Sequence, residues 1–342
     1  MKKILFSLNS LAAVLLIFAY ISPFIDPTIT GFFSIFGLFF PVILLLNVVF
    51  ILAWLMIKPE KALLSVLLIA IGYGPLIKYF GFNTTDSNNQ GISIISYNIG
   101  KTRVDFSRPD KEKYIENFRQ FLQSENPDII CLQEKTKWHL DIYNDLFADY
   151  NVYPNNELGT SICSKFPIVN GGNIPFETVA HNASWVDLDI NDQIIRFYSI
   201  HLSSNRITRT TEKMLDNPDI SNKAIWGDLK FIFNRYNKHA QIRSLQLDTL
   251  LNHASQSPYP IVISGDFNDV PQSYIYNKMC SEYNDAFTEA GFDMAKTFIS
   301  VVPGLRIDYT FVSPDIKVLS NKVLKTNLSD HYPILSTIDP PN

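Results

Sequence analysis

The residues of this chain that could do chemistry lie in six short polar clusters, each at the end of an apolar run. Buried strands that end in polar residues at one edge of a sheet can build an active site on a rigid frame. The clusters offer carboxylates, carboxamides and histidines, and they hold no serine or cysteine nucleophile motif. These side chains suit a hard divalent cation and a phosphate ester. The clusters are SYN at 96–98, QE at 133–134, His201, GDFND at 265–269, RIDY at 306–309 and SDHYP at 329–333.

The elements that must position these clusters alternate between β-rich runs and helical runs from residue 91 onward. Residues 110–124 have apolar side chains at helical spacing and are followed by Pro127, and 223–252 form a second helical stretch. This mixture predicts an α/β fold in which two sheets pack face to face with helices outside. The expected strands are 91–97, 128–133, 162–164, 185–188, 193–202, 261–264, 308–313 and 334–338.

Three apolar segments, 4–22, 31–57 and 62–80, precede this part of the chain. Each is close to the roughly 20 residues that cross the hydrocarbon core of a bilayer. We therefore predict three transmembrane helices in an anchor at 1–80, a polar linker at 81–90, and a catalytic domain at 91–338. A cleaved signal peptide is the alternative for the first segment, but two further apolar segments follow it.

The distribution of lysines predicts the orientation of the anchor. Lys2 and Lys3 precede the first apolar segment, and Lys58 and Lys61 lie between the second and the third. Because basic residues favour the cytoplasmic side, these two regions are expected inside the cell. An odd number of crossings then places the catalytic domain outside the cytoplasm.

The overall charge gives little support to nucleic-acid binding. The chain carries 29 Lys+Arg and 33 Asp+Glu, a net charge of -4. Residues 1–84 hold five lysines and two acidic residues, so the remainder is more acidic than the whole chain. Nucleic-acid-binding domains are usually basic. A local basic patch can still bind a polyanion, so nucleic acid stays possible as a partner.

Seven motifs in sequential order resemble those of the endonuclease/exonuclease/phosphatase superfamily, which includes deoxyribonucleases, AP endonucleases, neutral sphingomyelinases and inositol polyphosphate 5-phosphatases. The resemblance covers about residues 91–338. It implies a four-layer α/β sandwich, two packed sheets flanked by helices, and phosphoester hydrolysis that depends on Mg²⁺ or Mn²⁺. The motifs are IISYNIG (94–100), DIICLQE (128–134), TSICSKFPI (160–168), YSIHL (198–202), ISGDFND (263–269), IDYTFVS (307–313) and LSDHYPI (328–334).

The resemblance also implies which residues hold the metal. Glu134 is the expected principal ligand, Asn98 helps to hold the metal or the phosphate, and Asp330 contributes to the metal site. Without the resemblance, Glu134 reads as a surface acid and Asn98 as a turn residue at the end of a strand.

The catalytic roles follow from the same resemblance. Asp266 is expected to orient or deprotonate the attacking water, and Asn268 to bind a phosphoryl oxygen. Asp308 is expected to pair with His331, which acts on the nucleophile or stabilises negative charge on the phosphate. His201 is expected to contact the phosphate or to protonate the leaving group.

Two further pairs of residues are expected to have a structural role and a substrate-binding role, respectively. Asp269 faces away from its neighbours in GDFND and is expected to be structural, as is Arg243 on the preceding helix. Arg206 and Arg209 begin a long basic stretch that can bind an anionic substrate as a lid. A solvated loop and helix is the alternative for that stretch.

Together these features predict a membrane-anchored, metal-dependent phosphodiesterase or phosphatase whose substrate is a lipid or small phosphoester. An extracytoplasmic endonuclease or exonuclease is the alternative. A non-catalytic membrane-anchored binding module is a further alternative, although such a protein would be expected to lose some of the site residues. No protein partner is evident from the sequence.

Overall fold

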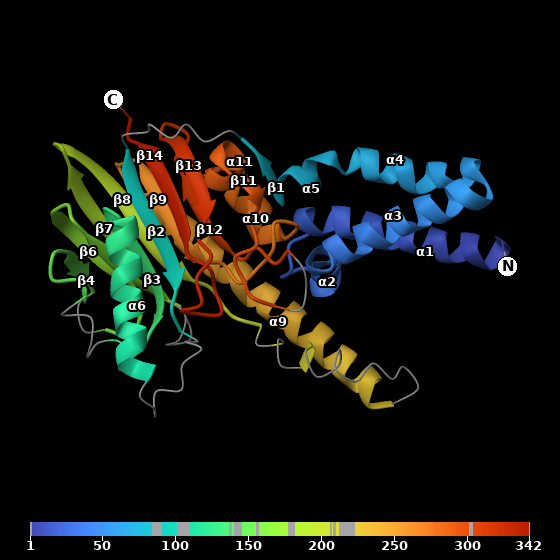
Figure 1. The fold of residues 1–342 in the computed structure, drawn as a ribbon, viewed down its shortest axis with the longest axis horizontal. Helices are drawn as coiled ribbons and strands as arrows, with labels where there is room; N and C mark the ends of the chain where they lie inside the picture. The colour runs from blue at the N-terminus through green and yellow to red at the C-terminus, as the bar shows by residue number, and fades with distance from the viewer. Residues whose placement is uncertain are drawn as a thin grey trace.

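A stem of apolar helices projects from a sandwich of two β-sheets in the computed structural model of the chain (Figure 1). The two parts are in extensive contact at the base of the stem. The structure describes residues 2–83, 91–100, 110–136, 139, 146–154, 157–176, 182–205, 207, 210–211, 223–300 and 304–341.

The first six-stranded sheet has the order β13-β14-β2-β3-β5-β4. Its strands β2 and β3 run parallel, so their C-terminal ends, at Asn98 and near Glu134, lie at the same edge. The strands are β2 (Ile92–Asn98), β3 (Ile129–Lys135), β4 (Asn151–Tyr153), β5 (Gly159–Ser164), β13 (Lys317–Val323) and β14 (Ile334–Asp339).

The second six-stranded sheet has the order β10-β12-β9-β8-β7-β6. Its central strands β8 and β9 are also parallel, and their register pairs His201 with Asp266. The antiparallel strand β12 pairs Asp308 with Asp266. The strands are β6 (Ile168–Pro175), β7 (Asn182–Ile190), β8 (Gln193–His201), β9 (Ile261–Asp266), β10 (Asn284–Asp285) and β12 (Asp308–Val312).

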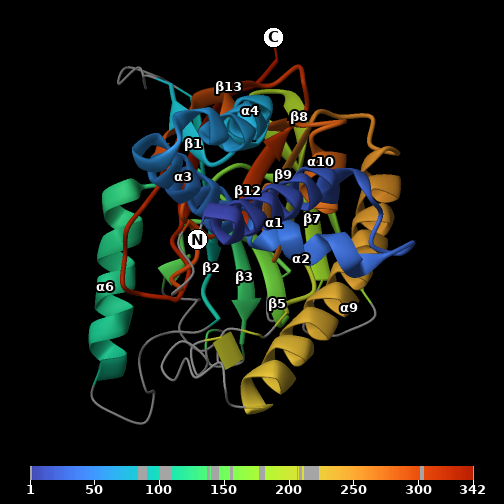
Figure 2. The ribbon, with the colours of Figure 1, turned by 90° about the vertical axis from the view of Figure 1, so that its right-hand side faces the viewer.

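Alternation along the strands separates the layers. In β2, Ile94 belongs to the core between the sheets, whereas Ile95 belongs to the core under α6 (Asp110–Glu125). The outer face of the second sheet is covered by α9 (Lys223–Ala254) and α10 (Tyr274–Met279). Figure 2 shows α6 and α9 on opposite sides of the strands. Two packed sheets flanked by helices confirm the α/β part of the expected fold.

The stem, residues 2–79, does not have the expected third continuous helix. By length and composition, two helices, Lys2–Phe24 and Phe40–Ile57, could cross a membrane among the described residues. The third apolar segment is divided between α4 (Leu63–Ile71) and α5 (Tyr73–Ile77). Gly72 separates them, and Pro75 lacks the N–H that a continuous helix needs. The other stem elements are α1 (Lys2–Ile21), η1 (Ser22–Phe24), η2 (Gly31–Phe33), α2 (Ser34–Leu38), α3 (Phe40–Ile57) and η3 (Pro59–Ala62).

A buried network of neutral polar side chains joins three stem helices. The Asn9 side-chain amide donates to Ser65 Oγ at 2.7 Å, and Ser65 donates to Asn47 Oδ1 at 3.0 Å. The indole of Trp54 donates to Asn9 Oδ1 at 2.9 Å. Because apolar faces alone give helices in lipid little reason to associate, hydrogen bonds of this kind help to fix their arrangement.

The stem is joined to the sandwich by hydrogen bonds and by a small sheet. Gln272 donates to the Ala19 carbonyl at 3.0 Å, and Arg306 donates to the Lys78 carbonyl at 3.0 Å. Strand β1 (Phe80–Phe82) pairs antiparallel with β11 (Phe292–Met294), beside α11 (Ala286–Ala290). The expected linker at 81–90 therefore begins inside a strand, and its residues 84–90 lie outside the described part of the chain. The stem is a packed part of the protein at this junction.

Candidate active site

The candidate site forms where the ends of strands from both sheets meet. Asn98 ends β2 in the first sheet, and Asp266 ends β9 in the second. The Asn98 amide donates to Asp266 Oδ2 at 2.9 Å, and this hydrogen bond joins the two sheets at the site. Both side chains are buried. The sandwich therefore brings together residues that are 168 positions apart in the sequence.

Glu134 is held in an unusual backbone conformation beside Asn98. Its φ is +57°, a value that costs a non-glycine residue energy and that is often found at functional sites. Its Oε1 lies 3.4 Å from the Asn98 amide nitrogen and 3.5 Å from His201 Nε2. A Cβ at Gly100 would lie 1.8 Å from Glu134 Oε2, so this glycine makes room for the carboxylate. The sequence had not singled out Gly100.

Asp266 is a buried carboxylate surrounded by polar groups. Its Oδ1 accepts a 2.8 Å hydrogen bond from the backbone N–H of Asn268, whose φ is +54°. The ring nitrogens Nε2 of His201 and of His331 each lie 3.8 Å from Oδ2. Burial, and then the neighbouring charge of Asp308, raise the pKa of Asp266 to about 8. The Asn268 amide donates one hydrogen to the Leu202 carbonyl at 2.9 Å.

Asp308 and His331 form the pair that the sequence predicts. His331 Nδ1 lies 3.1 and 3.0 Å from the two carboxylate oxygens of Asp308. Burial lowers the pKa of His331, but the charges of Asp308 and Asp266 outweigh it and raise the pKa to about 10. The ring is therefore positively charged at neutral pH and leaves Nε2 directed toward Asp266.

Thr297 and Ser329 position this pair, and Thr297 had no signal in the sequence. The hydroxyl of Thr297 accepts from the backbone N–H groups of Ile307 and Asp308, at 3.0 and 3.1 Å. The Ser329 hydroxyl donates to the Asn98 carbonyl at 2.8 Å and accepts from the His331 N–H at 3.3 Å. Ser329 thus ties the segment that carries His331 to strand β2.

The donor set fits a divalent cation. Ligand atoms of Asp266, Asp308 and His331 lie within 4.8 Å of one another, and Glu134 adds a third carboxylate that is one-third exposed. Among the described residues, no lysine or arginine forms an ion pair with these three carboxylates. Oxygen-rich, negatively charged sites of this kind are those that hard cations prefer. A bound divalent cation supplies polarisation of a phosphoryl oxygen and a lowered pKa for water.

The other expected site residues lie less centrally or outside the described chain. Asp330 is half-buried, with Oδ1 3.5 Å from the Ser329 hydroxyl. Arg206 and Arg209, the expected substrate-binding residues, lie outside the described residues. In the described part of the same basic stretch, Arg235 and Arg243 donate to Asn205, at 2.6 and 2.7 Å. These two arginines support a loop rather than project into the site.

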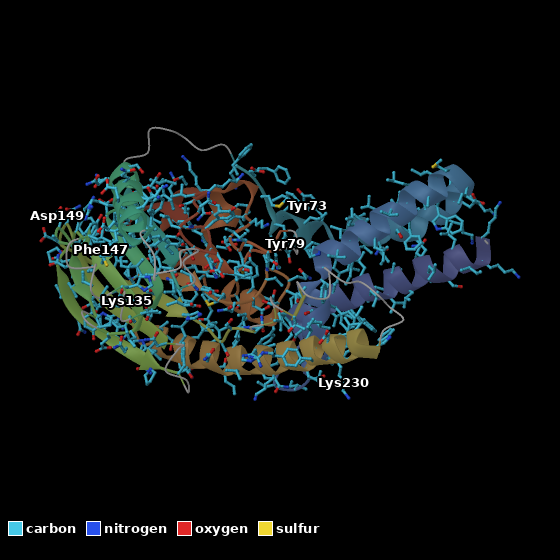
Figure 3. All side chains as sticks on the ribbon, turned by 60° about the horizontal axis from the view of Figure 1, so that its bottom comes forward. Tyr73, Tyr79, Lys135, Phe147, Asp149 and Lys230 are labelled. Atoms are coloured by element: carbon cyan, nitrogen blue, oxygen red, sulfur yellow. The ribbon has the colours of Figure 1, made fainter. Side chains whose placement is uncertain are left out.

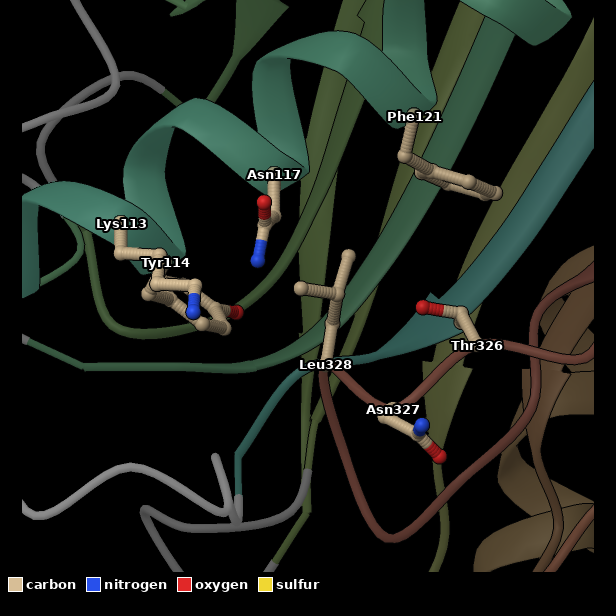
Figure 4. Close-up of a pocket in the computed structure, with 7 residues that line it drawn as sticks. All are labelled: Lys113, Tyr114, Asn117, Phe121, Thr326, Asn327 and Leu328. Carbon is tan, nitrogen blue, oxygen red and sulfur yellow. The ribbon is translucent and has the colours of Figure 1, made fainter. Parts of the chain in front are cut away.

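A pocket of about 410 Å³ lies next to the segment that carries His331 (Figure 4). One wall is α6 and the other is the segment 326–328, which runs directly into Ser329. Aromatic and aliphatic side chains alternate with polar ones around it. The lining residues are Lys113, Tyr114, Asn117, Phe121, Thr326, Asn327 and Leu328.

The fold and the site together define the class of phosphoester hydrolases with a two-sheet α/β sandwich. Residues 95–331 match the model of the endonuclease/exonuclease/phosphatase family, and the chain belongs to this family. The expected resemblance is thereby confirmed. Enzymes of the family hydrolyse phosphoesters and typically use divalent metals. Residues 2–79 match a second family model, described as a domain of unknown function.

Solved structures agree with the fold. Humanized TDP2 from D. rerio is 17% identical, with 73% of this chain and 100% of that chain covered and a TM-score of 0.54. A mannosyl-6-phosphatase from Bacteroides thetaiotaomicron is 18% identical, with 72% and 99% covered and a TM-score of 0.52. The human Nocturnin catalytic domain is 18% identical, with 75% and 97% covered and a TM-score of 0.52. No curated protein has a sequence that matches this chain.

Proposed function

We propose that this chain is a membrane-anchored phosphoester hydrolase that uses Mg²⁺ or Mn²⁺ and directs water in line at phosphorus. The observation that carries the proposal is the convergence of three carboxylates, from Glu134, Asp266 and Asp308, with two histidines at the edge where the sheets meet. A divalent cation offsets this negative charge and attracts the phosphate ester. Glu134 and Asn98 would hold the cation, with Asp330 beside them.

The remaining side chains have the proposed roles of moving a proton and binding the phosphoryl group. Asp266 accepts a proton from the attacking water, because a raised pKa brings a general base close to neutral pH. His331, charged and oriented by Asp308, stabilises negative charge on the phosphoryl oxygens. The second amide hydrogen of Asn268 is available to a phosphoryl oxygen, and His201 faces the leaving group.

A matched pair of substitutions tests this function in the full-length protein. Glu134→Gln keeps the size of the side chain and removes the charge that holds a hard cation, so phosphoester hydrolysis should fall by orders of magnitude. The exposed Glu282, changed to Gln, is the control and should leave the activity unaltered. EDTA should abolish wild-type activity, and Mg²⁺ or Mn²⁺ should restore it. Full activity in EDTA would show that the metal mechanism is wrong.

A lipid or small phosphoester is the substrate class that we favour. One structural neighbour is named a mannosyl-6-phosphatase, and the part of this chain after residue 84 has a net negative charge, which disfavours binding of long polyanions. A panel of small phosphoesters, phospholipids and plasmid DNA, assayed with the full-length protein, distinguishes the classes. Efficient DNA cleavage with a steep salt dependence would favour the alternative, an extracytoplasmic nuclease. No hydrolysis of any phosphoester would favour the binding module.

Exposed apolar side chains and lysine positions support the membrane anchoring. The outward faces of α1 and α3 expose many large aliphatic side chains, as lipid-facing helices do. Lys61 lies 4.5 Å from the Phe6 ring, so the α3–α4 turn and the start of α1 share the end of the stem away from the sheets (Figure 1). Basic residues favour the cytoplasmic side, which supports a sandwich outside the cytoplasm.

A C-terminal fusion tests this orientation. Alkaline phosphatase joined after residue 342 should be active in cells, because that enzyme requires export. A fluorescent protein that folds only in the cytoplasm should stay dark at the same position. The opposite result would place the sandwich inside the cell and would restore cytoplasmic nucleic acids as substrates.

A further inference from the structure

Exposed apolar side chains lie on the first turns of α9 and in the α1–α2 turn, which meets α9 farther along, where Ser244 donates to Asp26 at 3.0 Å. Trp226 is 60% exposed, and Leu229 and Phe231 are exposed nearby on the same helix. In the turn between α1 and α2, Phe24 is 73% and Ile29 is 82% exposed. Isolated exposed apolar residues are common, but several large ones on two elements that pack together indicate an interaction surface. We call these five residues the junction face.

The two elements that carry the junction face, α9 and the segment after α1, pack directly on each other. The Phe32 ring lies 6.0 Å from the Phe233 ring. Gly31 fits so closely against α9 that a Cβ there would lie 2.9 Å from Asn237 Cβ. Ile35 of α2 belongs to the same buried cluster as Ile232 of α9. The first half of α9 is therefore fixed to the segment that joins the two longest stem helices.

The position of residues 24–40, between the two candidate spans, determines how deep the junction face lies in the bilayer. One candidate span ends at Phe24 and the other begins at Phe40, so residues 24–40 lie at the bilayer surface if these helices cross it. The first half of α9 extends past the sheets on the side of the stem (Figure 1), and Figure 3 shows Lys230 near that end. Its apolar residues are thereby held at the level of the lipid headgroups.

The chemistry of the helix fits this layer. Lys230 and Lys238 are exposed on the same half of α9. Phe231 lies between them in the sequence, and Trp226 lies about one turn before Lys230. Basic residues together with tryptophan, phenylalanine and leucine characterise helices that lie in a bilayer surface, especially one with anionic lipids. A purely protein-binding face would not need to lie at the ends of two membrane-crossing helices.

We propose that the junction face is embedded in the headgroup layer of the bilayer, so that α9 joins the membrane surface to the active site. The inference rests on the membrane anchoring proposed above. Farther along α9, Arg243 and Tyr236 bind Asp269, and Arg243 also binds Asn205. Asn205 donates to the Asn268 carbonyl at 3.3 Å. The same helix that contacts the lipid therefore supports the GDFND loop of the active site. Phosphoesters at the membrane surface are then the substrates that lie nearest to the active site.

Tryptophan fluorescence in lipid nanodiscs tests the inference without an activity measurement. The difference between the spectra of the full-length wild type and Trp226→Phe isolates the emission of Trp226. We expect blue-shifted emission that loses intensity when the discs contain lipids brominated high on the acyl chain. Trp185, whose ring lies 4.1 Å from the Arg196 guanidinium and 5.2 Å from the His253 ring at the other end of α9, is the control. Its contribution, isolated with Trp185→Phe, should not be quenched by these lipids.

The same discs separate the possible failures. Val49 is half-exposed near the middle of α3, so the emission added by Val49→Trp should be quenched by lipids brominated deep in the acyl chain. Absence of this quenching would overturn the membrane anchoring itself. Quenching in the Val49→Trp protein with red-shifted, unquenched Trp226 would overturn only the junction face. Blue-shifted Trp226 emission that no brominated lipid quenches would mean that protein covers the face, and it too would overturn the inference. Phosphoester hydrolysis in the same sample reports separately on the enzyme function.

Discussion

Asp266 and Asp269 are two buried carboxylates in one five-residue loop, and their surroundings differ completely. Asp269 is bound by Arg243 through Nε at 3.0 Å and through a terminal nitrogen at 2.8 Å, and the Tyr236 hydroxyl donates to it. Asp266 has an amide, a backbone N–H and two histidines, and no arginine or lysine among the described residues. A buried carboxylate that is paired with a guanidinium typically has a structural role. A buried carboxylate without such a partner is a candidate for binding a ligand.

Strand β12 repeats the contrast. Asp308 is paired with a histidine, whereas Asp285, on the neighbouring strand, is paired with the buried guanidinium of Arg306 and accepts from the Tyr276 hydroxyl at 2.7 Å. Arg306 also binds the Lys78 carbonyl of the stem. The Asp285–Arg306 cluster therefore holds the sandwich to the stem, and the Asp269–Arg243 cluster supports the GDFND loop. The unbalanced cluster faces the edge where the sheets meet.

The largest effect that distinguishes the two kinds of carboxylate is expected from Asp266→Asn. This change removes a group proposed to accept a proton, so hydrolysis should fall roughly 10²- to 10⁴-fold. In EDTA, the free energy of unfolding should stay the same or rise, because burial disfavours the charged form of this carboxyl group and the substitution removes the charge. Steady-state rates and thermal unfolding measure the two effects. A variant that loses stability as well as activity would mean that Asp266 has a structural role like that of Asp269.

The next largest effect is expected from Asp269→Asn, three positions away. Loss of this charge leaves the fully buried Arg243 without its partner, which should cost about 3–5 kcal/mol of unfolding free energy. Denaturant unfolding of the purified protein measures the cost. Arg119, which pairs with Glu116 on the exposed face of α6, is the control, and Arg119→Met should change the stability by less than about 1 kcal/mol. A cost for Asp269→Asn as small as this would remove the distinction between the two aspartates.

The sequence could locate the strand ends of the site because that information is local. Apolar runs followed by polar residues predicted β2, β3, β8 and β9 and the positions of Asn98, Glu134, His201 and Asp266 at or near their ends. The motifs also indicated a structural role for Asp269 and Arg243, which the structure joins by a salt bridge. The functional roles of the site residues stay predictions.

The remaining features depend on contacts between distant parts of the chain. Thr297 supports Asp308 through backbone groups, Gly100 makes room for Glu134, and no local pattern announces either contact. At the break, Gly72 leaves room for Tyr20 of another helix, because a Cβ at that position would lie 1.9 Å from the tyrosine hydroxyl. Hydropathy alone read the segment 62–80 as one helix because it takes account neither of this contact nor of Pro75.

An intermediate effect is expected from separating the members of the Asp308–His331 pair. Each single substitution, Asp308→Asn and His331→Gln, should lower the activity strongly. The rate constant of the double variant should be less than about tenfold below that of the less active single variant, because the effects of groups that act as a unit are non-additive. The cycle of four rate constants measures this coupling. Fully additive losses would mean that Asp308 serves a role other than holding the ring.

The smallest effect is expected in the stem, where the buried polar cluster carries no charge at all. Asn47→Leu removes the acceptor for Ser65 and the donor to the Ala12 carbonyl, and side-chain hydrogen bonds between helices in lipid contribute roughly 0.6–2 kcal/mol. Unfolding in mixed micelles should show a loss of this size, with hydrolysis unaltered. The outward-facing Leu52, changed to Ala, is the control and should lose less. A loss of several kcal/mol at Asn47 would show that neutral clusters constrain this protein as strongly as its buried ion pairs, so that charge balance would not be what separates scaffold from site.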